Sequence, residues 1–305
     1  MGIAIKILGS SSATPQYNRH HSSQYVQIGK SHLLIDCGEA TQLQLKRYGV
    51  KITKLDTIFI SHLHGDHFFG LIGLLSSMHL SGRTEDLHIY GPNGLQEILL
   101  IQFKYSDTIL KFQIHFHLTN PEGFNFVTET DEFTVHSFPL KHRIACTGFL
   151  FKEKPKNYRI NKGLLPENML LQHIALLKKG NDVFDSEGNI LYSKSELTSP
   201  PRKSFSYAYC SDTIYDPSIC QYFEGVDCLY HEATFLHDML DRAQNTFHTT
   251  ALQAAQIALQ AKVGTLLLGH FSARYKELDA HLIEAKTVFE KSSLAQEGLT
   301  FLFDE

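Results

Sequence analysis

Runs of apolar and β-branched residues recur along the chain, and turns rich in glycine, serine or proline separate them. Such runs are typical of buried strands. Residues 24–28 and 32–36 flank Gly29 and Lys30, so they predict a hairpin. The complete set of strands predicted in this way comprises residues 3–8, 24–28, 32–36, 57–60, 88–90, 112–118, 124–127, 132–140, 206–210, 228–230 and 265–270.

Apolar residues at helical spacing lie between several of these strands. The helices that this spacing predicts comprise residues 40–48, 66–80, 91–105, 251–262 and 278–289. Gly49 follows the first of them and is typical of a helix end. The mixture of short strands with helices of about ten residues places the chain in the α/β class.

Residues 152 to about 203 depart from this pattern. Up to position 179 the segment holds seven basic and two acidic residues, a net charge of +5, and glycines and prolines interrupt it throughout. We expect an insertion that projects from the core and is helical near 167–177. Two interpretations stay open: an ordinary solvated surface excursion, or a basic arm that binds a phosphate backbone.

Composition sets broad limits on what the chain can be. It has 305 residues, 43% hydrophobic and 20% charged, which is enough for one large domain or two ordinary ones with a substantial core. The net charge of −4 does not by itself predict nucleic-acid binding, although a local basic segment can still provide it.

Cysteine usage and the N-terminus bear on the compartment. The five cysteines are scattered and form no Cys-x-x-Cys pair, which argues against a disulfide framework and against a cysteine zinc knuckle. The N-terminus has no basic segment followed by a long apolar one, and no apolar run approaches membrane-spanning length. We therefore expect a cytoplasmic protein with no membrane segment.

Potential metal-binding side chains are most concentrated at residues 61–67, Ser-His-Leu-His-Gly-Asp-His, between a predicted strand and a predicted helix. Ligand sites of α/β proteins form at such strand ends. Neutral imidazoles bind zinc, and a carboxylate can bind a second ion or accept a proton. Helix capping is the alternative explanation, but it accounts for Asp66 alone and not for His62, His64 and His67.

Three distant residues also follow predicted strands, namely His142, Asp212 and His270. A catalytic zinc takes about four or five ligands including solvent, so the first motif needs such partners. Each of these residues alone is more often a hydrogen-bonded surface group than a ligand; together with the first motif they predict a metal site. Asp36, at another strand end, is expected to hydrogen-bond a metal-bound histidine.

The spacing His-x-His-x-Asp-His at 62–67 resembles the motif of the metallo-β-lactamase superfamily. A longer ordered set, spread over nearly the whole chain, resembles ribonuclease Z, the tRNA 3′-endonuclease; its His-Glu-Ala-Thr tetrapeptide is the discriminating element. The matching residues are Asp36-Cys37-Gly38-Glu39, His62-Leu63-His64-Gly65-Asp66-His67, His142, Ser211-Asp212-Thr213, His231-Glu232-Ala233-Thr234, His248-Thr249-Thr250 and Gly269-His270-Phe271-Ser272.

This resemblance implies an αβ/βα sandwich of two mixed sheets, a single domain over residues 1–305, with residues 152–203 as a flexible tRNA-binding arm. It implies that His62, His64 and His142 hold one Zn²⁺ and that Asp66, His67 and His270 hold another, with Asp212 between them. It also implies substrate contacts, for which the candidates are Arg274, Lys152, Lys154, Lys156, Lys178 and Lys179.

Catalytic roles follow from the same resemblance. Two ions would polarise the phosphate and lower the pKa of a shared water. Asp66 would orient that water and take its proton, and Glu232 with His248 would protonate the leaving ribose oxygen. Alternative roles stay open for these last residues: Glu232 as half of a structural salt bridge, His248 as a neighbour of a helix cap.

The expected function is therefore removal of 3′ trailers from precursor tRNA, leaving a 3′-hydroxyl, by a homodimer. Two other functions stay open. One is hydrolysis of small phosphodiesters by the same metal site, which would not need the basic arm. The other is RNA binding without catalysis, which would not need Asp66, Glu232 and His248. Manganese or iron could replace zinc, because histidine and carboxylate sites are not selective by affinity.

Overall fold

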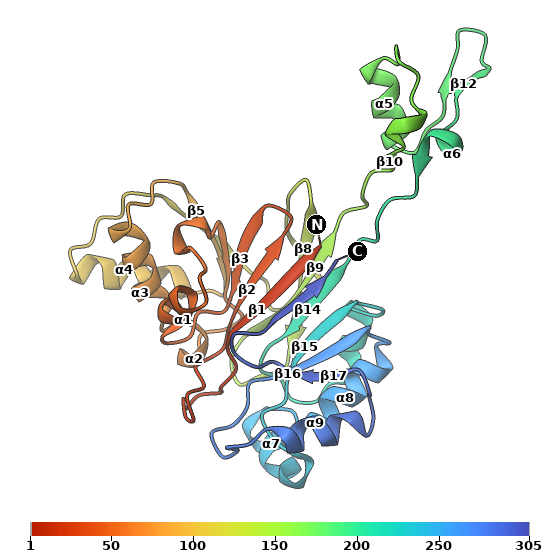
Figure 1. Ribbon diagram of the computed structural model, residues 1–305. Helices are drawn as coiled ribbons and strands as arrows, with labels where there is room; N and C mark the ends of the chain where they lie inside the picture. The colour runs from red at the N-terminus through yellow and green to blue at the C-terminus, as the bar shows by residue number, and fades with distance from the viewer. Residues whose placement is uncertain (1, 305) are drawn as a thin grey trace.

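Two seven-stranded sheets face each other in the computed structural model, and helices cover their outer faces (Figure 1). The structure describes residues 2–304, so Met1 and Glu305, the ends of the predicted domain, lie outside the described residues. The first sheet runs in the order β18 (Thr300–Phe303), β1 (Ile3–Gly9), β2 (Ser23–Ile28), β3 (Ser31–Ile35), β4 (Thr57–Phe59), β5 (Leu87–Gly91) and β6 (Ile114–Leu118).

The second sheet has the same number of strands and a similar mixture of directions. Its order is β17 (Ser292–Leu294), β16 (Thr265–Gly269), β15 (Cys228–Glu232), β14 (Ser206–Cys210), β9 (Cys146–Glu153), β8 (Phe133–Leu140) and β7 (Asn125–Glu129). Strands β3 to β6 pair in parallel in the first sheet, and β14 to β17 do so in the second. The predicted sandwich of two mixed sheets is confirmed.

Aromatic side chains fill the space between the sheets. The Phe59 ring on β4 lies 5.2 Å from the Phe149 ring and 5.3 Å from the Phe151 ring, both on β9. Tyr207 and Tyr209 of β14 are buried in the same layer. Since alternate residues of a strand point to opposite faces, the other side chains of these strands meet the helices outside.

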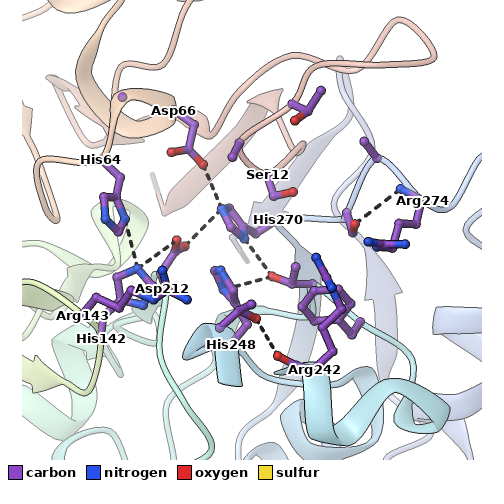
Figure 2. Close-up of a pocket in the computed structure, with 18 of the residues that line it drawn as sticks. Ser12, His64, Asp66, His142, Arg143, Asp212, Arg242, His248, His270 and Arg274 are labelled. Carbon is purple, nitrogen blue, oxygen red and sulfur yellow. Dashed lines mark hydrogen bonds and ion pairs between the residues drawn. The ribbon is translucent and has the colours of Figure 1, made fainter. Parts of the chain in front are cut away.

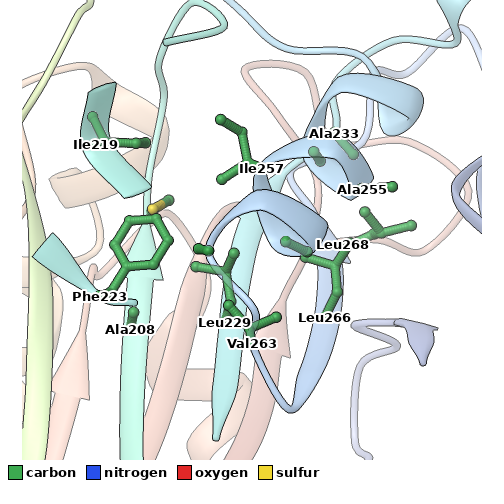
Figure 3. Packing of buried hydrophobic residues seen from close by; sticks show 14 of the residues in the cluster. Ala208, Ile219, Phe223, Leu229, Ala233, Ala255, Ile257, Val263, Leu266 and Leu268 are labelled. Carbon is green, nitrogen blue, oxygen red and sulfur yellow. The ribbon is translucent and has the colours of Figure 1, made fainter. Parts of the chain in front are cut away.

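The outer helices bury an apolar layer of their own. Helices α1 (Thr41–Arg47), α3 (Leu71–Leu80) and α4 (Leu95–Tyr105) pack on the first sheet. Helices α8 (Ala251–Gln260) and α9 (Asp279–Lys286) pack on the second, where Ile257 lies over Leu229 and Leu266 (Figure 3). None of the helices within residues 2–304 is both long and apolar enough to cross a membrane.

The predicted helix over 66–80 is in fact two helices, α2 (Gly65–Phe68) and α3. The break falls at Gly70, whose backbone N–H donates to the Cys37 carbonyl at 2.9 Å. A Cβ atom at Gly70 would lie 2.0 Å from the Gly38 carbonyl oxygen. This close approach anchors α2, which carries Asp66 and His67, against the chain that follows β3.

Among the strands of the two large sheets, β9, β17 and β18 were not predicted, and the first of these changes the boundary of the arm. Lys152 and Glu153 belong to β9, because the ladder with β14 continues to the pair Lys152 and Ser206. The arm therefore starts after Glu153, and the expectation that Lys152 is an arm residue was wrong.

Residues 154–205 leave the sandwich between β9 and β14 and project far from it (Figure 1). The arm has a small core of its own, made by Leu177, Val183 and Leu197. Its helix is close to the predicted one but starts four residues later. The elements of the arm are β10 (Arg159–Ile160), α5 (Leu171–Lys178), β11 (Val183–Phe184), β12 (Ile190–Tyr192), α6 (Lys194–Leu197) and β13 (Thr198–Ser199).

The remaining elements are short. They are α7 (Leu240–Thr246) and the 3₁₀ turns Ile52–Lys54, Lys162–Leu164, Pro217–Tyr222 and His237–Met239.

We predict that Gly70→Ala lowers the free energy of unfolding by about 1–3 kcal/mol, because the new methyl group has no room beside the Gly38 backbone. Gly73→Ala is the matched control: it lies inside α3, and its Cβ would meet only the end of the Gln42 side chain at 3.2 Å. That variant should be neutral or more stable by up to about 1 kcal/mol. Urea unfolding of both variants measures the difference, and equal stabilities would contradict the close approach.

Candidate metal centre

Four segments that follow strands meet at one edge of the sandwich and bring their polar side chains together (Figure 2). The turn at 61–67 follows β4, His142 follows β8, Asp212 follows β14 and His270 follows β16. Each segment belongs to a different part of the chain, so the sheet order determines the convergence. All seven of the predicted metal ligands lie in this cluster.

The first group of donor atoms consists of His62, His64, His142 and Asp212. The Nδ1 atom of His64 lies 3.1 Å from Nε2 of His62 and 3.0 Å from Nε2 of His142. Oδ2 of Asp212 is 3.7 Å and 3.8 Å from these two Nε2 atoms. Four donor atoms thus surround one point.

The second group consists of Asp66, His67, Asp212 and His270. The Nε2 atoms of His67 and His270 are 3.3 Å apart, and Oδ2 of Asp66 lies 3.3 Å from His270 and 3.5 Å from His67. Asp212 enters this group through its other oxygen, Oδ1, at 3.2 Å from His270 and 3.4 Å from His67. One carboxylate therefore borders both groups.

Hydrogen bonds on the outer side of these rings indicate which nitrogen carries the proton. Nδ1 of His142 lies 3.0 Å from the Phe247 carbonyl, which can only accept, so this nitrogen is the protonated one. Nδ1 of His67 lies 2.7 Å from a carboxylate oxygen of Asp36 and donates to it in the same way. Nδ1 of His270 lies 2.9 Å from the Thr234 hydroxyl, which itself donates to Glu232.

The inward nitrogens of His142 and His270 are consequently lone pairs. Burial lowers the pKa of His62, which favours the neutral ring. Burial would also lower the pKa of His67, but Asp212, Asp66 and Asp36 outweigh it and raise that pKa, so the carboxylates here attract positive charge. Oδ1 of Asp212 is buried without a hydrogen-bond partner. Lone pairs and carboxylates that converge without protons require cations.

The spacing of the donor atoms fits zinc. A tetrahedral ion with bonds to nitrogen of about 2.0–2.1 Å places its ligand atoms about 3.3 Å apart. The inward nitrogens lie 3.0–3.3 Å apart in both groups. The residues present therefore fit two metal ions on either side of Asp212.

Asp36 holds the first motif in place, as the sequence led us to expect. Its carboxylate accepts hydrogen bonds from the Ser61 backbone at 2.8 Å, the Ser61 hydroxyl at 2.9 Å, the His67 ring at 2.7 Å and the Tyr209 hydroxyl at 2.7 Å. Tyr209 comes from the second sheet. A single buried carboxylate thus orients a donor histidine and joins the two sheets.

Glu232 and His248 form an ion pair beside the metal cluster. Oε1 of Glu232 lies 2.8 Å from Nδ1 of His248, and the same carboxylate accepts from the backbone N–H of Thr213 and of Thr234 at 3.1 Å each. Burial by itself would lower the pKa of His248, but Glu232 outweighs it and raises the pKa to about 9. The ring is therefore protonated at neutral pH.

A cavity of about 720 Å³ opens over this cluster. His64, Asp66, Asp212 and His248 face it, and Arg274, the candidate phosphate contact, lines it too (Figure 2). Two further arginines, Arg143 and Arg242, also line the cavity, and the sequence analysis did not identify them. In the sequence, the only feature that points to Arg143 as a site residue is its position next to His142. No sequence feature points to Arg242.

The proposed arm lysines do not reach this cavity. Lys154 pairs with Glu129 at 2.8 Å and Lys156 with Glu153 at 2.9 Å, both at the base of the arm. Lys178 and Lys179 are exposed at the end of α5. In Figure 1 the arm extends away from the edge that carries the metal cluster. These lysines and the metal cluster are therefore separate regions of this chain.

Comparisons with known proteins give consistent results. The chain is 51% identical to ribonuclease Z from Cytophaga hutchinsonii over 99% of this chain and 96% of that protein, and 43% identical to ribonuclease Z from Bacteroides fragilis over 97% of each. The crystal structure of the short form of human tRNase Z matches with a TM-score of 0.72, at 25% identity over 98% of each chain.

Two further comparisons concern the fold. The metallo-β-lactamase-fold protein YhfI from Bacillus subtilis matches with a TM-score of 0.69 at 23% identity over 99% of each chain, so the predicted fold is confirmed. A family model described as anti-Pycsar protein Apyc1 matches residues 3–159, which include His62 and His142 but neither Asp212 nor His270. Because the curated relatives match along nearly its whole length, the chain belongs to the ribonuclease Z family.

Proposed function

We propose that this protein is a metal-dependent endonuclease that removes 3′ trailers from precursor tRNA. The observation that carries the proposal is the pair of donor groups that share Asp212 on the floor of a cavity lined by three arginines. Arginines bind phosphate in a bidentate manner, and paired metal ions act on phosphodiesters. The names of the full-length relatives support the same substrate.

We propose Zn²⁺ in both positions, because imidazole and carboxylate ligands at this spacing suit it. His62, His64 and His142 would hold one ion, and Asp66, His67 and His270 the other, with Asp212 between them. When bound, the ions supply positive charge that polarises the phosphate and makes water acidic enough to lose a proton near neutral pH.

Asp66 would then act as the general base. It faces the cavity, and its Oδ2 atom lies among donor nitrogens, which holds the carboxylate in one orientation. In this position Asp66 can orient a water molecule toward the phosphate and accept its proton.

Glu232 and His248 would act as the acid on the other side of the reaction. His248 is protonated and borders the cavity, and Glu232 fixes its ring through Nδ1. As the hydroxyl of the water bonds to phosphorus, the bond from phosphorus to the ribose O3′ breaks, and this oxygen takes its proton from His248. The products are a tRNA with a 3′-hydroxyl and a trailer with a 5′-phosphate.

The arm would bind the body of the tRNA from a second subunit of a homodimer. Its exposed Lys178 and Lys179 lie away from the metal cluster of their own chain, so they would serve the active site of the partner. With tRNA as its substrate, the protein would work in the cytoplasm.

Asp66→Ala is expected to lower cleavage of a precursor tRNA by about 10²–10⁴-fold, because the water loses its general base and one metal position loses a ligand. A chelator should abolish cleavage by the wild type. The assay follows a labelled 3′ trailer. Asp86→Ala is the control, since Asp86 is an exposed carboxylate paired with His115 outside the cavity.

Other outcomes of this assay identify the competing functions. If the protein hydrolyses a small phosphodiester but does not cleave precursor tRNA, the metal-dependent hydrolysis is supported and the assignment of tRNA as the substrate is contradicted. If the metal-loaded protein cuts neither substrate, the protein binds RNA without catalysis.

His248→Ala should lower tRNA cleavage by about 10²–10⁴-fold while leaving hydrolysis of an activated aryl phosphodiester within a few-fold of wild type. An aryl oxide is a good leaving group and departs without being protonated. The ribose O3′ is a poor leaving group and must take a proton as it departs. Steady-state rates on both substrates measure the ratio, and His237→Ala, a partly buried histidine that does not line the cavity, is the control. A similar loss on both substrates would contradict the role of an acid.

The arm can be tested by complementation between two inactive variants. One carries Asp66→Ala with an intact arm; the other replaces residues 156–202 by an Asn-Gly turn, in keeping with the register between the neighbouring strands β9 and β14. If the arm serves the partner subunit, mixing and reassembling the two variants restores tRNA cleavage. Mixtures that stay as inactive as the separate variants would show that arm and site act within one chain.

A further inference from the structure

A second cavity, of about 590 Å³, adjoins the metal cluster on the opposite side of His64. The loops after β4, β5 and β6 and the turn between β8 and β9 form its walls. His64 lines both cavities, and His248 lines only the first. A strand of nucleic acid that crosses the metal cluster from the first cavity can therefore continue over His64 into the second.

The walls of this cavity are apolar and carry no fixed charge. Leu63, Pro92, Leu118, Pro121 and Ile144 supply most of the surface, and among the described residues no lysine, arginine, aspartate or glutamate lines it. Leu118 is 73% exposed and Ile144 is 38% exposed, so part of the apolar surface of each side chain is uncovered in this chain. Such walls suit a flat, uncharged group and do not suit a phosphate.

A small number of polar atoms point to what this group is. Thr119 lines the cavity and is only 4% exposed, yet its hydroxyl has no hydrogen-bond partner. Buried hydroxyls nearly always have one, so this atom is available to a ligand. Asn93 and Asn120 add side-chain amides to the same walls. Amides and a hydroxyl can hydrogen-bond the edges of an unpaired nucleobase.

We propose that this second cavity binds the base of the first trailer nucleotide, the one that follows the scissile phosphate. The assignment rests on the proposed function, in which His248 protonates the O3′ atom on the tRNA side. The tRNA end therefore lies in the first cavity, beside His248 and the three arginines. The trailer leaves in the other direction, past His64, and its first base meets the apolar walls.

The test compares two precursor tRNAs that differ only in the first trailer nucleotide, which has a normal base in one and is abasic in the other. The abasic substrate loses the burial of one uncharged base against apolar walls, so wild-type kcat/KM should fall roughly 5- to 100-fold on it. Thr119→Val, which removes only the hydroxyl, should shrink this ratio and change the preference among the four bases.

Ala145→Trp fills the cavity from an exposed position on its rim. It should lower kcat/KM on the normal substrate to the level of the abasic one and leave the abasic substrate unaffected. Ala280→Trp, at an exposed site on α9, is the matched control and should preserve the wild-type ratio. Metal content and unfolding midpoint of both variants show whether they are folded and loaded.

The outcomes separate this proposal from the function on which it rests. If wild-type protein does not cleave the normal precursor, the proposed function fails. If it cleaves normal and abasic trailers equally well, the function stands and the base site is wrong. An equal loss on both substrates in Ala145→Trp would also overturn the base site, because filling the cavity would then act through the metal cluster.

Discussion

The buried carboxylate of Asp36 is the contact on which the rest of the metal centre depends. It lies after β3 with a left-handed backbone, φ 55°, and accepts from Ser61, His67 and Tyr209. Ser61 and His67 bracket the donor turn, and Tyr209 belongs to the opposite sheet. A buried carboxylate without these donors would be costly, so the network forces the turn and the two sheets into one arrangement.

This arrangement concentrates charge that only cations can balance. The outward nitrogens of His67, His142 and His270 donate to acceptors around the site, so their inward nitrogens are the atoms left to face a bound cation. Asp66 and Asp212 add negative charge on the same side. The protein therefore holds its ligands in place through their outer hydrogen bonds, and metal binding relieves the repulsion among their inner atoms.

How much of the fold and of the metal site can be predicted from the sequence depends on how far apart along the chain the interacting residues lie. The turn at 61–67 is local, so its spacing alone indicates a metal site, and the ends of the strands also identify His142, Asp212 and His270. The break at Gly70 was missed because it arises from contact with Gly38, which lies far away along the chain. Arg143 lies in the turn after β8 and Arg242 on the short helix α7, and both reach the cavity only through tertiary packing, for which the sequence carries no periodic signal.

Charge shows how an acidic protein can act on a polyanion. The net charge is −4, yet Asp36, Asp66, Asp212 and Glu232 are buried around the metal cluster, where His248 and any bound metal ions would balance them locally. The field at the mouth of the cavity then comes from Arg143, Arg242 and Arg274, and a second basic region lies on the distant arm. Two positive regions so far apart suit a substrate whose length is comparable to that of the protein. A small phosphodiester could contact only the first of them, so the arm favours a structured RNA as the substrate.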